Sequence, residues 1–138
     1  MDTKFDFRDG NGPVPAHKHP NGWGWVADTS SVSETAYVGP NARVFDGARV
    51  YGNALVFDGA RVFDGARVFD GALVYGNALV YGNALVFGDA WVFGDARVYD
   101  NAMVSGYARV YDDDRVYDDD RVYGDAVVSG NAEVSDDE

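Results

Sequence analysis

The sequence predicts an all-β fold in which very short strands coil around a single axis. Valine recurs at every sixth position from Val26 to Val134, nineteen times without an insertion. Alanine stands two positions before the valine in fifteen of these nineteen hexads. The two residues that separate successive Ala-x-Val-x segments are drawn mainly from Gly, Asn and Asp, which adopt positive φ at low cost.

Each hexad is therefore expected to form a four-residue strand followed by a two-residue corner. In an extended Ala-Arg-Val-Phe segment, Ala and Val share one face and Arg and Phe share the other. Asp-Gly also occurs in hairpins, so an antiparallel meander is the alternative. A sheet of nineteen such strands would far exceed the ~10 strands at which open sheets curl or split, and the coil is therefore favoured.

The successive hexads A-R-V-F-D-G, A-L-V-Y-G-N and A-L-V-F-G-D resemble the hexapeptide-repeat proteins. This resemblance covers residues 24 to 135 and implies a single left-handed parallel β-helix of triangular cross-section, with three hexads per coil and about six coils. The sequence departs from the family after the valine, where Phe or Tyr stands in thirteen hexads.

Two segments are expected along the chain. Residues 1–23 contain no hexad and are predicted to form an N-terminal cap or arm, with Phe5, Phe7 and Trp23 covering the open core of the first coil. Residues 24–138 are predicted to form the β-helix, with a short acidic C-terminal tail.

The composition narrows the classes of partner. A formal net charge of −12 disfavours nucleic acid and anionic lipid surfaces, because phosphate contacts need clustered Lys and Arg. No apolar stretch approaches the ~18 residues of a membrane span, and no signal peptide is recognised. The chain has no cysteine. Cytoplasmic, extracellular-fibre and virion locations all stay open.

Eighteen residues per coil allow the outward side chains to be assigned to three faces. One face carries arginine columns beside aromatic columns, which allows cation–π contacts. On another face no charged residue interrupts the apolar side chains of three adjacent coils, and we predict a homo-oligomeric contact there. This apolar face consists of Leu55, Phe57, Leu73, Tyr75, Trp91 and Phe93. The alternative is that the aromatic columns only strengthen strand pairing while staying in contact with water.

The acidic residues are almost all Asp and the basic residues almost all Arg, which resembles proteins of salt-loving microbes or their viruses. One corner column is mostly aspartate, and adjacent carboxylates repel one another until salt screens them. Thermal stability is therefore predicted to rise with salt. The column runs through Asp28, Asp46, Asp64, Gly82, Asp100, Asp118 and Asp136.

Two aspartates, Asp114 and Asp120, occupy the inward position that Ala holds in other hexads. With neighbouring aspartates they offer oxygen ligands for a hard cation, and Ca²⁺ is the candidate. The alternative is a loose coil whose carboxylates turn to water or to backbone amides. His17 and His19 form an H-x-H pair that metal sites use, but no third ligand is evident, and a Pro-flanked loop with incidental histidines also explains them.

The predicted function is a non-enzymatic, structural and self-assembling protein that forms a lateral homo-oligomer, an end-to-end filament, or both. A carbohydrate-binding or surface-binding rod, such as a virion spike or fibre module, is the alternative. The resemblance also implies acyltransferases and carbonic anhydrase-like enzymes, many of them trimeric, which use histidines. No histidine follows residue 19, so no catalytic residue is assigned.

Overall fold

The computed structural model describes residues 3–128 and the short strand at 133–134. Within these residues all regular structure is β, and the strands form three sheets in which every third strand is a neighbour. No helix among them is long and apolar enough to cross a membrane. The predicted all-β fold is confirmed.

The three sheets contain nine, six and six strands. The first sheet consists of β1 (Lys4–Asp6), β2 (Pro13–Lys18), β3 (Trp25–Ala27), β6 (Arg43–Val44), β9 (Arg61–Val62), β12 (Leu79–Val80), β15 (Arg97–Val98), β18 (Arg115–Val116) and β21 (Glu133–Val134). The second consists of β4 (Ser31–Val32), β7 (Arg49–Val50), β10 (Arg67–Val68), β13 (Leu85–Val86), β16 (Met103–Val104) and β19 (Arg121–Val122). The third consists of β5 (Tyr37–Val38), β8 (Leu55–Val56), β11 (Leu73–Val74), β14 (Trp91–Val92), β17 (Arg109–Val110) and β20 (Val127–Val128).

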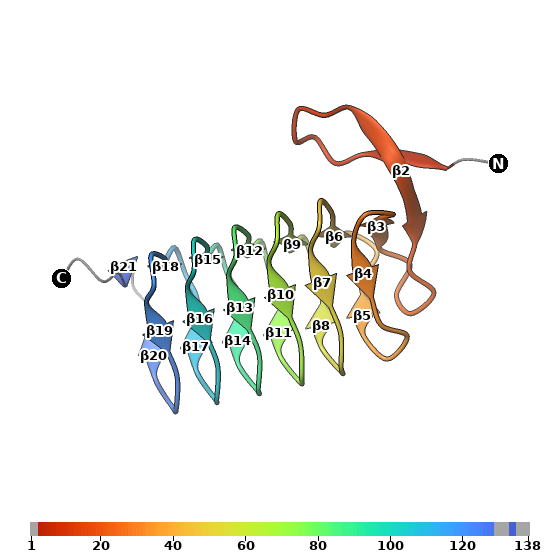
Figure 1. Ribbon diagram of the computed structural model, residues 1–138. Helices are drawn as coiled ribbons and strands as arrows, with labels where there is room; N and C mark the ends of the chain where they lie inside the picture. Colours follow the sequence, from red (N-terminus) through yellow and green to blue (C-terminus); the bar gives the residue numbers. More distant parts are fainter. Residues whose placement is uncertain (1–2, 129–132, 135–138) are drawn as a thin grey trace.

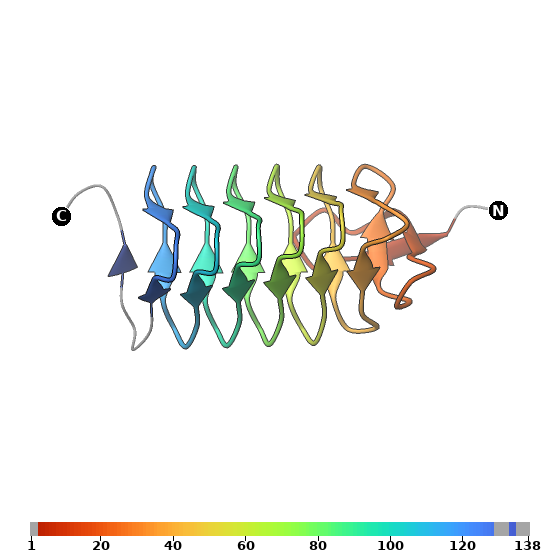
Figure 2. The same ribbon diagram turned by 90° about the horizontal axis from the view of Figure 1, so that it is seen from below.

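The coils stack side by side along one axis, from β3–β5 at one end to β18–β20 at the other (Figures 1 and 2). Strands eighteen residues apart pair in parallel and in register, as Val44 does with Val62. Backbone N–H groups donate to carbonyls of the following coil, for example Arg43 N–H to the Ala60 carbonyl at 3.0 Å. The described residues therefore form six coils of three hexads with a triangular cross-section, as predicted.

Between Ala36 and Val110 the core of the coil contains only small and branched side chains. Every inward Ala from Ala36 to Ala108 and every Val from Val38 to Val116 is fully buried. Because the repeat places Ala and Val at the same depth in each coil, the core forms continuous columns along the axis. The predicted inward placement of Ala and Val is confirmed.

The corners use a left-handed backbone at their first residue. Asp46, Asp58 and Asp64 have φ of 58°, 56° and 59°, and Gly76 and Gly82 take the same place with φ of 67° and 68°. An aspartate in this conformation directs its carboxylate at the next coil: Asp58 Oδ2 accepts the Gly76 N–H at 3.2 Å. Asp-Gly corners therefore place the aspartate, not the glycine, at positive φ.

The N-terminal residues form a hairpin that leaves the coil axis. Strand β1 pairs antiparallel with β2, and β2 continues antiparallel to β3. Both views show the turn of the hairpin reaching back over the first coils (Figures 1 and 2). Its apolar side chains build a second small core on the outer surface of the first sheet, together with Trp25 and Phe45.

The expected role of three aromatic residues as a plug for the open core is wrong. Phe7 is buried, but it stacks on the outward ring of Phe45 at 4.8 Å. Phe5 stacks on Trp25 at 4.6 Å, and Trp23 is 64% exposed. The alternation in Phe5-Asp6-Phe7 turns both phenylalanines to one side of β1, and that side faces the outer surface of the coil.

Polar groups of the loop after β2 cover the first coil instead. The buried His19 places Nε2 2.8 Å from the Ala36 carbonyl, and Asn21 Nδ2 donates to the same oxygen at 3.1 Å. Gly24 N–H donates to the Val38 carbonyl at 2.9 Å. These bonds satisfy carbonyls that, in later coils, accept N–H groups from the coil before.

Candidate interaction surfaces

The outward aromatic side chains form three stacked ladders, one along each sheet. Neighbouring rings lie 4.8 to 5.3 Å apart and are nearly parallel. The ladders are Phe7-Phe45-Phe63-Tyr81-Tyr99-Tyr117, Tyr51-Phe69-Phe87, and Phe57-Tyr75-Phe93-Tyr111. Inside a ladder both faces of a ring contact other rings, so the ring edges face outward.

The structure brings together the six residues predicted to form the apolar face. Leu55, Leu73 and Trp91 pair in register on β8, β11 and β14. The three rings that follow the valines stack beside them at 4.8 and 4.9 Å. Leu55 is 36% exposed and the other five are partly buried. The apolar face is therefore continuous over three coils of the third sheet.

A charged group borders this face at its C-terminal end. The Arg109 guanidinium lies 4.5 Å from the centre of the Trp91 ring, in cation–π contact. Burial raises the pKa of Tyr75, and the positive charge of Arg109 opposes this increase. Arg109 of the next coil and Asp58 of the corner after Phe57 therefore both bring charge near this face, the first at Trp91 and the second at Tyr75.

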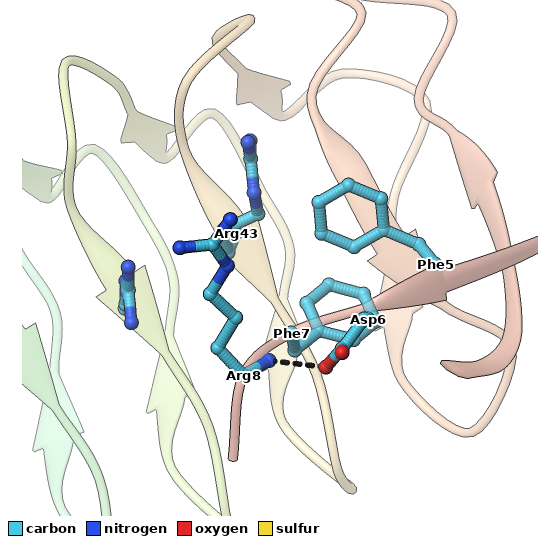
Figure 3. Close-up of a pocket in the computed structure, with 6 residues that line it drawn as sticks. Phe5, Asp6, Phe7, Arg8 and Arg43 are labelled. Carbon is cyan, nitrogen blue, oxygen red and sulfur yellow. Dashed lines mark hydrogen bonds between the residues drawn. The ribbon is translucent and has the colours of Figure 1, made fainter. Parts of the chain in front are cut away.

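An arginine-rich pocket lies between the N-terminal hairpin and the first sheet. It has a volume of about 510 Å³ and is lined by Phe5, Asp6, Phe7, Arg8, Arg43 and Arg61. Figure 3 shows Phe5 and Phe7 of the hairpin beside Arg43 of the coil, with the Arg8 side chain extending toward Arg43. The Arg8 backbone N–H donates to Asp6 Oδ1 at 2.7 Å. Three guanidinium groups therefore share this pocket with one carboxylate.

The environment of Arg43 shows how close these charges are. Its guanidinium lies 4.8 Å from the Phe5 ring centre, and Nη1 donates to the Pro40 and Ala42 carbonyls at 3.1 and 2.9 Å. Burial lowers the pKa of Arg43, and the positive charge of Arg61 lowers it further. An anion in the pocket would reduce this like-charge repulsion.

The two inward aspartates lie where the hexad pattern places them. Asp114 is fully buried and Asp120 is partly buried, and the Oδ2 atom of each is inaccessible to solvent. Within residues 3–128 and 133–134, no group of three or more His, Asp or Glu side chains is arranged to hold a metal ion. The calcium site at Asp114 and Asp120 stays a prediction.

The two histidines point to different partners. His17 lies on β2, half exposed, with Nδ1 2.7 Å from Asp28 Oδ1. His19 is buried against the first coil by its contact with the Ala36 carbonyl. The side chains of this H-x-H pair therefore meet separate groups of the β-helix, and His19 helps to cap it.

The arginine pocket was missed at the sequence level. The repeat assigns Arg43 and Arg61 to one column, but it gives no information on which surface the N-terminal segment covers. The available signal was the alternation of Phe5, Asp6, Phe7 and Arg8, which is typical of a strand with one apolar side.

Comparison with known proteins finds similarity to one family of repeats. Residues 48–64, 72–86, 78–94 and 96–112 match the family model described as the YdcK beta solenoid repeat. No curated protein and no solved structure matches the chain. The matched segments lie within the six stacked coils, each spanning two or three hexads. The chain is a β-solenoid repeat protein.

Proposed function

We propose that this β-solenoid is a non-enzymatic structural protein that assembles with copies of itself, side by side, through the apolar face. The observation that carries this proposal is the continuous row of Leu55, Leu73 and Trp91 beside their stacked rings. Six large apolar side chains over three coils approach the several hundred Å² at which an exposed patch usually marks an interaction site.

The rigidity of this face favours association. Rings that are already stacked on their neighbours have little rotamer freedom left to lose in an interface. The parallel coil also holds the face flat over three coils, which suits packing against a second copy. These features support a lateral contact without a conformational change.

The N-terminal end of the solenoid supports lateral over end-to-end assembly. Strand β2 covers the edge of β3, and in the loop after β2 the Gly24 N–H donates to the Val38 carbonyl of β5. Of the three edge strands in the first coil, β4 is the one not paired with a described N-terminal segment. Stacking another molecule on this end would displace the cap.

Leu73→Asp is expected to convert the oligomer to a monomer, because it introduces a carboxylate at the centre of the apolar face. Size-exclusion chromatography with light scattering measures the mass. Leu85→Asp, at the equivalent partly buried position of the second sheet, is the matched control and should leave the oligomer intact. Equal masses for wild type and Leu73→Asp would contradict the lateral contact.

Adaptation to high salt is part of this proposal. Burial raises the pKa of Asp46, and the negative charges of Asp9 and Asp64 add to this, while a backbone hydrogen bond from Asp64 opposes it. In the same column Asp64 Oδ2 accepts the Gly82 N–H, and Asp100 Oδ2 accepts the Asp118 N–H, both at 3.2 Å. These hydrogen bonds offset part of the repulsion between the carboxylates of the column. Dissolved salt can screen the repulsion that is left.

The melting temperature is expected to rise from dilute buffer to molar NaCl, and to rise less in Asp46→Asn. A raised folded-state pKa means that the native state binds a proton more readily than the unfolded state does. At neutral pH the melting temperature of Asp46→Asn should therefore exceed that of the wild type. This difference in melting temperature should shrink as the pH falls through the raised pKa toward the ordinary ~3.9. A melting temperature that is flat or falls with salt would contradict this account.

Binding of an acidic carbohydrate is a second candidate function, and the arginine pocket favours it. The ladders are poorly suited to sugar stacking because their ring faces are occupied by other rings. The pocket instead offers three guanidinium groups beside two phenylalanine rings, a combination suited to carboxylated or sulfated sugars.

Arg61→Gln is expected to weaken binding of oligogalacturonate at least tenfold, because it removes one of the pocket cations. Calorimetric titration measures the affinity, and Arg49→Gln on the second sheet controls for net charge. Undetectable binding by the wild type, or an equal loss in both variants, would exclude this function for the pocket.

A further inference from the structure

The second aromatic ladder is interrupted at one coil. Tyr51, Phe69 and Phe87 stack at 4.8 and 4.9 Å with nearly parallel planes. The following coil carries Ser105 at the ring position, and the coil after it carries Tyr123. Because β13, β16 and β19 pair in register, these side chains follow one another along the same column.

A pocket of about 460 Å³ opens at this interruption. It is lined by Phe87, Met103, Ser105, Arg121 and Tyr123, and we refer to it as the ladder gap. Tyr123 is 68% exposed, whereas the ladder ring Phe87 is partly buried. A small side chain at Ser105 therefore leaves an open space between two aromatic residues of the same column.

The dimensions of the ladder gap suit one planar ring. The backbone positions of Phe87 and Tyr123 are two coils apart in one column, and each ring step in this ladder is 4.8 to 4.9 Å. A ring inserted midway would lie one step from each neighbour, inside the range of ~4.5–7 Å that aromatic pairs prefer. Two stacked rings would not fit between them, so the gap accepts a single one.

The polar groups of the ladder gap select among such rings. The exposed Arg121 provides a guanidinium group and Ser105 provides a hydroxyl, and the five lining residues include no carboxylate. The Met103 side chain supplies a polarizable sulfur that favours aromatic contact. A carboxylate attached to the inserted ring would find a charge-assisted hydrogen-bond donor in Arg121.

We propose that the ladder gap binds a small aromatic carboxylate, with its ring inserted between Phe87 and Tyr123 and its carboxylate paired with Arg121. This site lies on the second sheet, away from the apolar face of the third sheet and from the arginine pocket of the first sheet. It is therefore a binding activity in addition to self-assembly and does not depend on it.

The test is calorimetric titration of the full chain with 2-naphthoate. We expect saturable binding to the wild type and at least a tenfold loss in Ser105→Phe, because the new ring completes the ladder and fills the gap. Ser105→Ala, which keeps the gap open and removes only the hydroxyl, should lose much less affinity than Ser105→Phe. Arg121→Gln should weaken 2-naphthoate binding while leaving the neutral probe 2-naphthylmethanol unaffected.

Thermal melts show whether each variant folds, and Ser105→Phe is expected to melt at or above the wild-type temperature because it adds a stacked ring. If Ser105→Phe does not fold, Tyr123→Ala is tested in its place. It removes one wall of the ladder gap and should likewise weaken 2-naphthoate binding. Undetectable binding, or equal binding to wild type and Ser105→Phe, would overturn the proposal. The proposal would also be overturned if an aromatic ring of a second copy of the chain fills the gap. In that case 2-naphthoate binding would be undetectable and the Ser105→Phe variant would lose an oligomer that the wild type forms.

Discussion

Replacing Ala96 with Asp is expected to lower the free energy of unfolding by about 3–5 kcal/mol, the loss typical of an uncompensated buried charge. Ala96 is fully buried in the Ala and Val core, midway along the solenoid. A carboxylate there must either stay ionised without solvent or take up a proton through a raised pKa. Chemical denaturation at neutral pH measures the loss, which should shrink as the pH is lowered.

The matched control for this substitution is Asn101→Asp, which adds the same charge at the exposed corner of the same hexad. It should change the free energy of unfolding by no more than about 0.5 kcal/mol. Asp114 occupies the position eighteen residues after Ala96, so the two sites belong to the same inward column. Similar losses for Ala96→Asp and Asn101→Asp would contradict the placement of Ala96 in an apolar core.

Gly76→Val is expected to lower the free energy of unfolding by about 2 kcal/mol or more, because a β-branched residue is strained at positive φ. Gly76 has φ of 67°, and a Cβ placed there would lie 2.8 Å from Gly94 N and 3.0 Å from Gly94 O. Both atoms belong to the backbone of the next coil. Aspartate holds the equivalent corner one coil earlier, at Asp58 with φ of 56°, so an unbranched Cβ is accommodated at such a corner and the larger cost of Val comes from its branched Cβ. Denaturant unfolding measures the change.

Two further substitutions show whether the loss in Gly76→Val comes from backbone strain at positive φ or only from replacing a glycine. Gly76→Asp should be much milder, since Asp58 holds the same conformation one coil earlier and accepts the Gly76 N–H. Gly47→Ala should leave stability unchanged or raise it by up to about 1 kcal/mol, because the nearest atom to its added Cβ is 3.6 Å away. Equal losses for Gly76→Val and Gly76→Asp would contradict this account of the corner.

The repeated part of the fold was predictable because the repeat specifies its own register. Once eighteen residues complete a coil, each hexad is expected to pair with the hexads eighteen residues before and after it. Val62, for example, pairs with Val44 and Val80. The same arithmetic placed Leu55, Leu73 and Trp91 on one sheet. Those positions needed no knowledge of side-chain conformations.

The remaining features depend on contacts that the repeat does not encode. The hairpin packs Phe7 on Phe45 because the N-terminal segment turns back over the coil, and no periodicity specifies that turn. The contact of Arg109 with Trp91 likewise depends on the rotamers of two long side chains in adjacent coils. The arginine pocket needs both the hairpin and the coil, and was therefore invisible in the sequence.

Negative-stain electron microscopy of the purified full chain tests the central claim, self-assembly through the apolar face, most directly. We predict discrete particles in which rods lie side by side, and single rods in the Leu73→Asp variant. Single rods in wild-type preparations at every concentration would contradict self-assembly. Long end-to-end fibres that persist in Leu73→Asp would contradict the lateral contact.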